Sequence, residues 1–269
     1  MSRQAIIVGH LSPDLDCLCA MWILRRWHNL GQAALRFVPA GATLGDAPAD
    51  ADPLVTHVDT GGGRFDHHAL ADQSLSATEL VRRAVAPDEQ VLERIARDVT
   101  RLDHALATRG TAPDILNLIE GFNALYPEHP EQVALAMFAN FDAWYAYEAR
   151  QVRLEQAFAD RIEFETPWGR AIAMQSDDGG SARLAFGAGA VLYVYRDGKG
   201  NMGIAARSRG PVDLTQVLYD LKRIDPGADW FLHPSRRLLL CGTPKAPPRV
   251  PSRLTLEQLI GVLRGDHLF

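Results

Sequence analysis

The feature that most constrains the fold of this chain is a short apolar run that ends in a cluster of polar side chains. Residues 5–8 read Ala-Ile-Ile-Val, and His10, Asp14 and Asp16 follow closely. An uninterrupted run rich in β-branched residues is typical of a strand buried on both faces of a parallel sheet. Open α/β sheets bind ligands at the carboxyl ends of their strands. The segment therefore predicts an α/β fold with a site at this edge.

A helix is expected to follow the cluster, because Leu18, Met21 and Trp22 recur at helical spacing. Two carboxylates one residue apart, next to an imidazole, resist joint ionisation unless a cation holds them. This arrangement favours a divalent metal ion. A capped helix start beside a buried histidine explains the segment equally well when it is taken alone.

A second apolar piece, residues 54–58, leads into Asp59, three glycines and the triplet Asp66, His67 and His68. The glycines allow a tight turn. Adjacent side chains on an extended segment point to opposite sides, so one histidine is expected to bind metal while the other faces substrate. Asp66 is suited to orient one of them. The alternative is a polar surface turn.

Taken in order, these motifs resemble motifs I to III of the DHH phosphoesterase superfamily. The superfamily includes RecJ-type exonucleases, oligoribonucleases acting on nanoRNA, cyclic-dinucleotide phosphodiesterases and family II inorganic pyrophosphatases. Residues 57–68 are particularly similar to the melanocyte-proliferating-gene nuclease branch. The resemblance covers most of the chain and is closest in residues 5–68. It implies an N-terminal parallel-sheet domain with flanking helices, and a hydrolase acting on phosphoester or phosphoanhydride bonds.

The superfamily has a fourth motif, an Asp on a later element, for which Asp98, Asp103 and Asp142 are candidates. Asp103 lies at the edge of the apolar stripe of its helical segment, whereas Asp142 lies well off the stripe of its own. Asp103 is therefore the predicted ligand. An ion pair of Asp103 with Arg97 or Arg101 is the alternative explanation for a carboxylate on an inward face.

The resemblance implies two ion positions. One takes His10 and Asp14, the other takes Asp16, His67 and Asp103, and Asp59 bridges them. Carboxylate oxygens with some imidazole nitrogen favour Mn²⁺ first and Mg²⁺ second. Two cations about 3.5 to 4 Å apart support in-line displacement at phosphorus. Asp59 and His68 are the predicted catalytic residues, with His68 contacting phosphate or assisting the leaving group, a role that His67 could exchange with it.

The 269 residues have room for two domains. We predict a metal-binding domain with a helical linker over residues 1–160, and a smaller α+β domain over residues 166–269, in which residues 190–196 and 202–207 form a hairpin. Residues 1–165 carry a formal charge of −10 and residues 166–269 carry +5. The acidic half suits metal ions, and the basic half suits phosphate.

The segment 203–214 resembles the part of DHH-associated domains whose arginines face substrate phosphates, which makes Arg207 and Arg209 the phosphate-binding candidates. A solvated basic turn is the alternative. The Gly-Gly-Gly-His loop usual in nuclease members is absent, and residues 225–234 stand in its place. His233 is a candidate for part of that loop's role.

No apolar run approaches the roughly 20 residues of a membrane span, and no signal peptide precedes the first strand, so the expected location is the cytoplasm. Cys17, Cys19 and Cys241 are expected to be buried thiols. A net acidic chain argues against tight duplex binding, so a short single-stranded oligonucleotide or a nucleotide is the expected substrate. Homodimer formation stays open. The alternatives are a pyrophosphatase-like phosphoanhydride hydrolase and a non-catalytic metal- or nucleotide-binding module.

Overall fold

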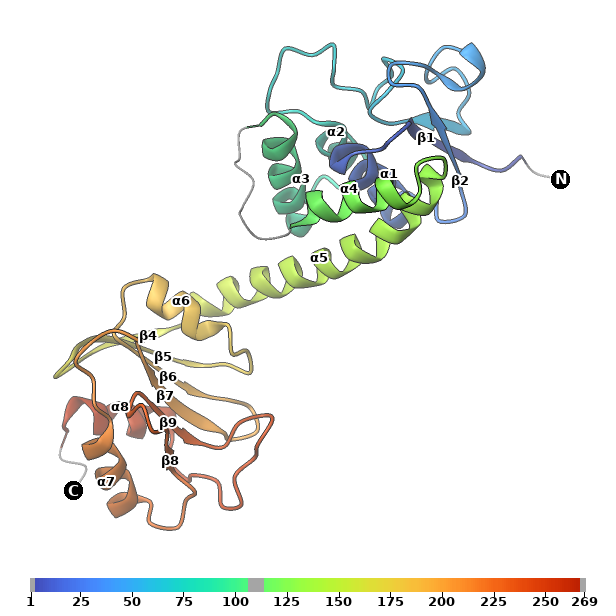
Figure 1. The fold of residues 1–269 in the computed structure, drawn as a ribbon. Coiled ribbons are helices and arrows are strands. Elements are labelled where there is room, and N and C mark those ends of the chain that lie inside the picture. Colours follow the sequence, from blue (N-terminus) through green and yellow to red (C-terminus); the bar gives the residue numbers. More distant parts are fainter. Residues whose placement is uncertain (1–2, 106–113, 267–269) are drawn as a thin grey trace. The chain divides into compact units, whose positions relative to one another are not determined.

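The computed structural model describes residues 3–105 and 114–266. The chain is a mixed α/β protein that divides into two compact units, Met1–Arg150 and Gln151–Phe269 (Figure 1). Helix α5, Pro130–Phe158, carries the chain from the first unit into the second. Although α5 has 29 residues, no helix in the described part of the chain is both long and apolar enough to cross a membrane.

The first unit contains a parallel sheet of three strands in the order β2-β1-β3. Strand β1, Ile6–His10, lies between β2, Ala34–Val38, and β3, Val55–His57. The apolar residues of β1 are buried because the strand has a neighbour on each edge and helices beside it. In a parallel sheet the carboxyl ends of all strands meet at one edge. The residues that follow β1 and β3 therefore lie close together.

Helix α1, Leu15–Trp27, is the central helix of the first unit, with an unbroken buried run from Leu15 to Leu24. Helix α1 packs against α2, and α2 packs against α3. The large ring of Trp22 contacts Trp27 and Phe141. The other elements of this unit are the 3-10 turn η1, Leu44–Asp46, and the helices α2, Ala77–Val85, α3, Gln90–Asp103, and α4, Ile115–Leu125.

The start of α2 is held by buried polar contacts. Ser76 caps the helix by accepting a hydrogen bond from the Glu79 amide at 3.3 Å, and Thr100 Oγ1 donates to Ser76 Oγ at 3.0 Å. The sequence Ser76-x-x-Glu79 suggested a reciprocal capping box. Only one half forms, because the Glu79 carboxylate instead accepts hydrogen bonds from Arg82 and Arg83.

The second unit is built on a six-stranded mixed sheet in the order β4-β5-β6-β7-β9-β8. The predicted hairpin is present as β6 and β7, which pair in antiparallel fashion. One face carries a core with α7 and α8, and the other face packs against α6. The elements are β4, Ile162–Thr166, β5, Gly169–Gln175, α6, Ser181–Gly187, β6, Leu192–Arg196, β7, Met202–Ala206, α7, Thr215–Ile224, β8, Phe231–Leu232, β9, Leu238–Cys241, and α8, Leu256–Arg264.

We predict that Ser76→Ala lowers the free energy of unfolding by about 1 to 2 kcal/mol, because it removes the cap of α2 and leaves the buried Thr100 hydroxyl without its acceptor. Urea unfolding followed by circular dichroism measures the change. The matched control is Ser74→Ala, since Ser74 is exposed two residues earlier, and we expect a change within about 0.5 kcal/mol there. Equal effects of the two substitutions would contradict this account of the α2 cap.

Candidate metal centre

The edge formed by the carboxyl ends of β1 and β3 gathers histidine and aspartate side chains from distant parts of the sequence. His10 is the last residue of β1, and Asp59 lies two residues after the end of β3. Asp14 caps α1, and Asp16 lies in its first turn. The remaining two residues are His67, in the loop after β3, and Asp103, the last residue of α3.

The loop after β3 turns sharply to bring His67 back to Asp59. Asp59 has a left-handed backbone with φ of 57°, a conformation that Asp tolerates better than most residues. Its amide donates to the carbonyl of Phe65 at 2.9 Å, which closes the loop. At Gly61, with φ of 80°, a Cβ would lie only 2.8 Å from Thr43 Cγ2. Glycine is therefore required for the close approach of this turn.

Three carboxylates surround a single imidazole nitrogen. His67 Nε2 lies 3.4 Å from Asp59 Oδ1, 3.5 Å from Asp16 Oδ2 and 3.5 Å from Asp103 Oδ2. These separations are long for hydrogen bonds. They are close to the spacing of donor atoms that share one ion, since atoms about 2.1 Å from an ion lie roughly 3.0 Å apart in octahedral and roughly 3.4 Å apart in tetrahedral geometry.

Two of these buried atoms have no hydrogen-bond partner within the described residues, namely His67 Nε2 and Asp59 Oδ1. Unsatisfied buried polar atoms are costly and rare in folded proteins. A cation between them would satisfy both at once. This observation shows that the residues fit a metal ion.

A second position lies beside His10. Its Nε2 is 3.3 Å from Asp59 Oδ2 and 3.8 Å from Asp14 Oδ1. Its Nδ1 is 2.9 Å from the carbonyl of Leu11, and donating to it leaves Nε2 facing the carboxylates. The two oxygens of Asp59 thus face different imidazoles, His10 and His67. This is the geometry expected of a bridging carboxylate.

Asp16, which lies beside His67, is held from behind by the start of α2. Its Oδ2 accepts from the Ala77 amide at 2.7 Å and its Oδ1 accepts from the Thr78 amide at 2.8 Å. The positive end of the α2 dipole supports this carboxylate. Asp14 is more exposed, and its Oδ1 accepts from the Cys17 amide at 3.0 Å.

The electrostatics of the centre reflect several buried carboxylates in close contact. Burial and the charge of Asp59 raise the pKa of Asp16 to about 7, and burial also raises the pKa of Asp103. Burial would raise the pKa of Asp59 as well, but the neighbouring imidazoles of His10 and His67 lower it to about 2. The proximity of the Asp59 carboxylate raises the pKa of His67 to about 9. The cluster therefore attracts positive charge, from protons or from a cation.

His68 and Asp66 form a pair at the rim of this centre, where His68 Nδ1 also lies 3.6 Å from Asp59 Oδ1. The His68 side chain is 66 % exposed, and its Nδ1 lies 2.7 Å from Asp66 Oδ1. Asp66 also accepts hydrogen bonds from the amides of Gly62 and His68. The two adjacent histidines thus have different surroundings, with His67 among buried carboxylates and His68 open to solvent.

Two residues near the centre were not predicted as part of the site. His104 shares a cluster with His67 and Asp103, and its Nε2 lies 2.8 Å from the carbonyl of Leu75. Cys17 shares a cluster with His10 and Asp59. The sequence signal for Cys17 was its position directly after Asp16, although the sequence analysis treated Cys17 only as a buried thiol. The sequence signal for His104 was its position next to Asp103.

The other candidates for the fourth aspartate have different environments. Asp98 is exposed on α3. Asp142 accepts hydrogen bonds from Trp22 Nε1 and Arg26. Arg97 pairs with Glu93 rather than with Asp103. Asp103 is the one of the three that contacts the proposed ligands.

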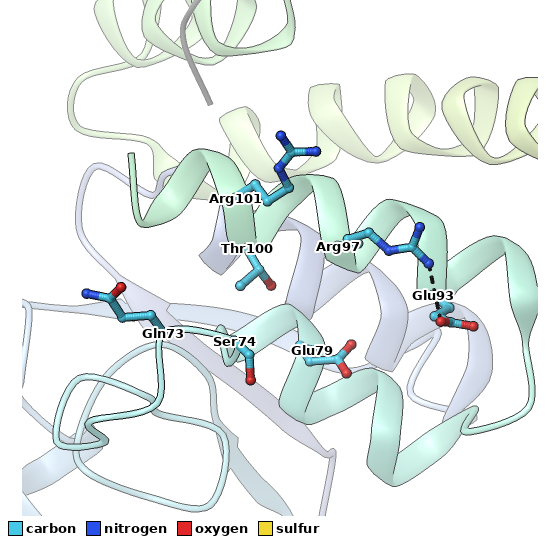
Figure 2. Close-up of a pocket in the computed structure, with 7 residues that line it drawn as sticks. All are labelled: Gln73, Ser74, Glu79, Glu93, Arg97, Thr100 and Arg101. Atoms are coloured by element: carbon cyan, nitrogen blue, oxygen red, sulfur yellow. Dashed lines mark hydrogen bonds and ion pairs between the residues drawn. The ribbon is translucent and has the colours of Figure 1, made fainter. Parts of the chain in front are cut away.

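A cavity of about 380 Å³ adjoins the centre and is lined in part by Asp14, Asp16 and Asp103. A larger cavity of about 470 Å³ lies between α2 and α3 (Figure 2). Its lining contains both Arg97 and Glu93 but none of the proposed metal ligands. Of these two cavities, the smaller is therefore the one that borders proposed metal ligands.

The basic candidates of the second unit lie on two neighbouring loops. The guanidinium of Arg207 donates to the carbonyl of Phe186, while Arg237 donates to the carbonyl of Arg207 at 2.9 Å. Arg209 is exposed and has no partner within residues 3–105 and 114–266. His233 is exposed, with Nδ1 2.9 Å from Ser235 Oγ.

No family model matches the chain, and no curated protein matches it. Among solved structures, an uncharacterised protein from Helicobacter pylori G27 is 11 % identical, with a TM-score of 0.28 over 98 % of this chain and 100 % of that one. An exopolyphosphatase-related protein from Bacteroides fragilis is 12 % identical, with a TM-score of 0.28 over 98 % of this chain and 91 % of that one. Likeness at this level establishes neither fold nor function.

We predict that Mn²⁺ binding strengthens from pH 6 to pH 8 and releases protons. Below the raised pKa values of Asp16 and His67, both groups carry protons that a cation must displace. Isothermal titration calorimetry in buffers of different ionisation enthalpy measures both quantities. An affinity independent of pH would contradict this reading.

We also predict that Asp103→Asn weakens Mn²⁺ binding by about 10-fold or more, because it removes a charged ligand. The matched control is Asp98→Asn on the same helix, which should bind Mn²⁺ as the unaltered protein does. The same titration serves for both variants. Equal affinities in the two variants would exclude Asp103 as a ligand.

Proposed function

We propose that this protein is a metal-dependent phosphoesterase that hydrolyses phosphodiester bonds of short single-stranded oligonucleotides or dinucleotides. The observation that carries the proposal is the pair of buried, unpartnered atoms His67 Nε2 and Asp59 Oδ1 at the edge of a parallel sheet. Carboxylates at 3.4 to 3.5 Å surround that imidazole nitrogen. The order of the sequence motifs, which resembles that of the DHH phosphoesterases, supplies the reaction class. We propose the cytoplasm as its location.

Six residues would hold two divalent ions. Asp59 bridges the two positions, the first takes His10 and Asp14, and the second takes Asp16, His67 and Asp103. Oxygen donors predominate, which favours Mn²⁺ first and Mg²⁺ second. When bound, such an ion pair neutralises charge on the attacking and leaving oxygens of an in-line displacement at phosphorus.

The protein's own groups orient the substrate around this centre. Asp66 holds the exposed imidazole of His68 through Nδ1, which leaves Nε2 free to contact a phosphate oxygen or to donate a proton to the leaving oxygen. Asp59 acts by positioning the two ions.

The second unit would supply phosphate contacts. Arg209 offers exposed guanidinium donors, and Arg207 lies two residues earlier on the same loop. Guanidinium groups bind phosphate in a bidentate manner. His233 is the third candidate. A basic patch of this small size suits a short substrate rather than a duplex.

The test is hydrolysis with Mn²⁺ across a panel of pApA, short single-stranded RNA and DNA, 3′,5′-cyclic dinucleotides, bis-p-nitrophenyl phosphate and pyrophosphate. We expect cleavage of the dinucleotide and the short oligonucleotides. Asp59→Ala should reduce the rate to that of the protein without added metal, while Asp98→Asn should stay fully active. A fully active Asp59→Ala protein would overturn the two-metal proposal.

Other results of this substrate panel would favour the alternative functions. Cleavage of pyrophosphate alone would indicate a phosphoanhydride hydrolase. Metal binding without turnover of any substrate would favour a non-catalytic metal- or nucleotide-binding module. Gel filtration of the same preparation tests for a homodimer.

We predict that Arg209→Ala raises KM for the oligonucleotide by about 10- to 100-fold with little change in kcat, because a hydrogen bond to a charged group contributes about 1.5 to 3 kcal/mol. Steady-state kinetics with a labelled oligonucleotide measures both constants. Arg223→Ala, an exposed arginine on α7, is the control. An unchanged KM in Arg209→Ala would remove Arg209 from the phosphate site.

A further inference from the structure

A third type of donor atom lies beside the proposed metal centre, the thiol of Cys17. A ring nitrogen of His10, the Cys17 sulfur and a carboxylate oxygen of Asp59 all lie within 4.8 Å of one another. Cys17 is fully buried and is not part of a disulfide. This sulfur plays no part in the phosphoesterase function described above.

The local fold holds the sulfur against the end of β1. Cys17 is in the first turn of α1, and its amide donates to Asp14 Oδ1 at 3.0 Å. A Cβ on Gly9 would lie only 2.6 Å from the Cys17 sulfur. The thiol thus occupies space that is available only because residue 9 is glycine. Gly9 directly precedes His10 on β1.

A second observation concerns Asp59, the carboxylate that the two proposed ion positions share. The Asp59 side chain is 2 % exposed, and its Oδ1 has no hydrogen-bond partner within the described ranges. Its other oxygen lies 3.3 Å from His10 Nε2. Oδ1 faces His67, so the buried carboxylate that lacks a partner on that side presents its other oxygen to His10, the imidazole that shares a cluster with Cys17.

The two ion positions differ in their donors. Around His67 the candidate donors are oxygen and nitrogen only, from Asp16, Asp59, Asp103 and the imidazole itself. Around His10 a sulfur is added. Thiolate ligands favour Zn²⁺ and related softer ions, whereas carboxylates favour Mn²⁺ and Mg²⁺.

We propose that Cys17 is a metal ligand that supplies thiolate sulfur to the ion held by His10 and Asp59, and that it makes this position prefer thiophilic divalent ions. The inference rests on the proposed two-metal function. On binding, the thiol loses its proton to solvent and the sulfur–metal bond forms, with a length of about 2.3 Å for Zn²⁺. The two positions then bind different ions preferentially, one thiophilic and one hard.

The experiment is titration of the metal-free full-length protein with Co²⁺, followed by absorption spectroscopy. A thiolate bound to Co²⁺ gives an intense charge-transfer band in the near ultraviolet, which oxygen and nitrogen ligands do not give. We expect the band in the unaltered protein and its loss in Cys17→Ser. The weaker visible bands of Co²⁺ bound at the other position should remain in that variant and show that it is folded.

The other two cysteines provide matched controls. Cys19 lies on the same helix and Cys241 lies in the second unit, and both are buried and free. The band should persist in Cys19→Ser and in Cys241→Ser. If Cys17→Ser does not fold, persistence in both controls still assigns the sulfur to Cys17, because the chain has three cysteines.

The outcomes separate this inference from the proposed function. Bound Co²⁺ with visible bands but no charge-transfer band would overturn the role of Cys17 and leave the two-metal centre standing. No Co²⁺ binding at all would overturn both. A band that persists in folded Cys17→Ser would also overturn the inference.

Ion selectivity gives a second readout. By competition with a chromophoric chelator, Cys17→Ser should lose about 10-fold or more in Cd²⁺ affinity. Its Mn²⁺ affinity should change by less than about 3-fold, because Mn²⁺ binds thiolate weakly. Equal losses for the two ions would contradict a sulfur ligand and indicate a general disturbance of the site.

Discussion

The main constraint on the first unit is that it buries several carboxylates together at one edge of a parallel sheet, where their mutual repulsion must be offset. Asp16, Asp59 and Asp103 all approach His67 Nε2. Burial first, and the neighbouring charge of Asp59 second, oppose the ionisation of Asp16 and raise its pKa to about 7. A fold that keeps these groups buried requires compensating positive charge, and in the function proposed above divalent ions would supply it.

Several local features serve this arrangement. The left-handed backbone of Asp59 and the close turn at Gly61 return His67 to the strand ends. The start of α2 supplies two amides to Asp16. Gly9 gives the Cys17 sulfur its place beside His10. Each feature lies in a different segment, so the centre exists only when the sheet and its helices are assembled.

The sequence allowed the strand ends and their polar residues to be predicted, because buried strands and helical stripes have periodic patterns. Strand β1, helix α1 and the position of Asp103 on α3 follow from such patterns. Helix α4 and strand β2 were not predicted, since neither has a clear period bounded by turn signals. The position of the Cys17 sulfur within 4.8 Å of Asp59 was not predictable either, because it depends on how a helix and two strands pack. The pattern Ser76-x-x-Glu79 predicts the Ser76 cap of α2. The pattern does not predict the hydrogen bonds of Glu79 with Arg82 and Arg83.

The most direct test of the central claim is electron paramagnetic resonance of the full-length protein loaded with Mn²⁺ to saturation. A carboxylate shared by two Mn²⁺ ions couples their electron spins, so we predict the spectrum of a coupled Mn²⁺ pair in the unaltered protein. Asp59→Ala should lose that coupling. A spectrum of isolated Mn²⁺ ions in the saturated unaltered protein, or no bound Mn²⁺, would contradict a two-metal centre bridged by Asp59.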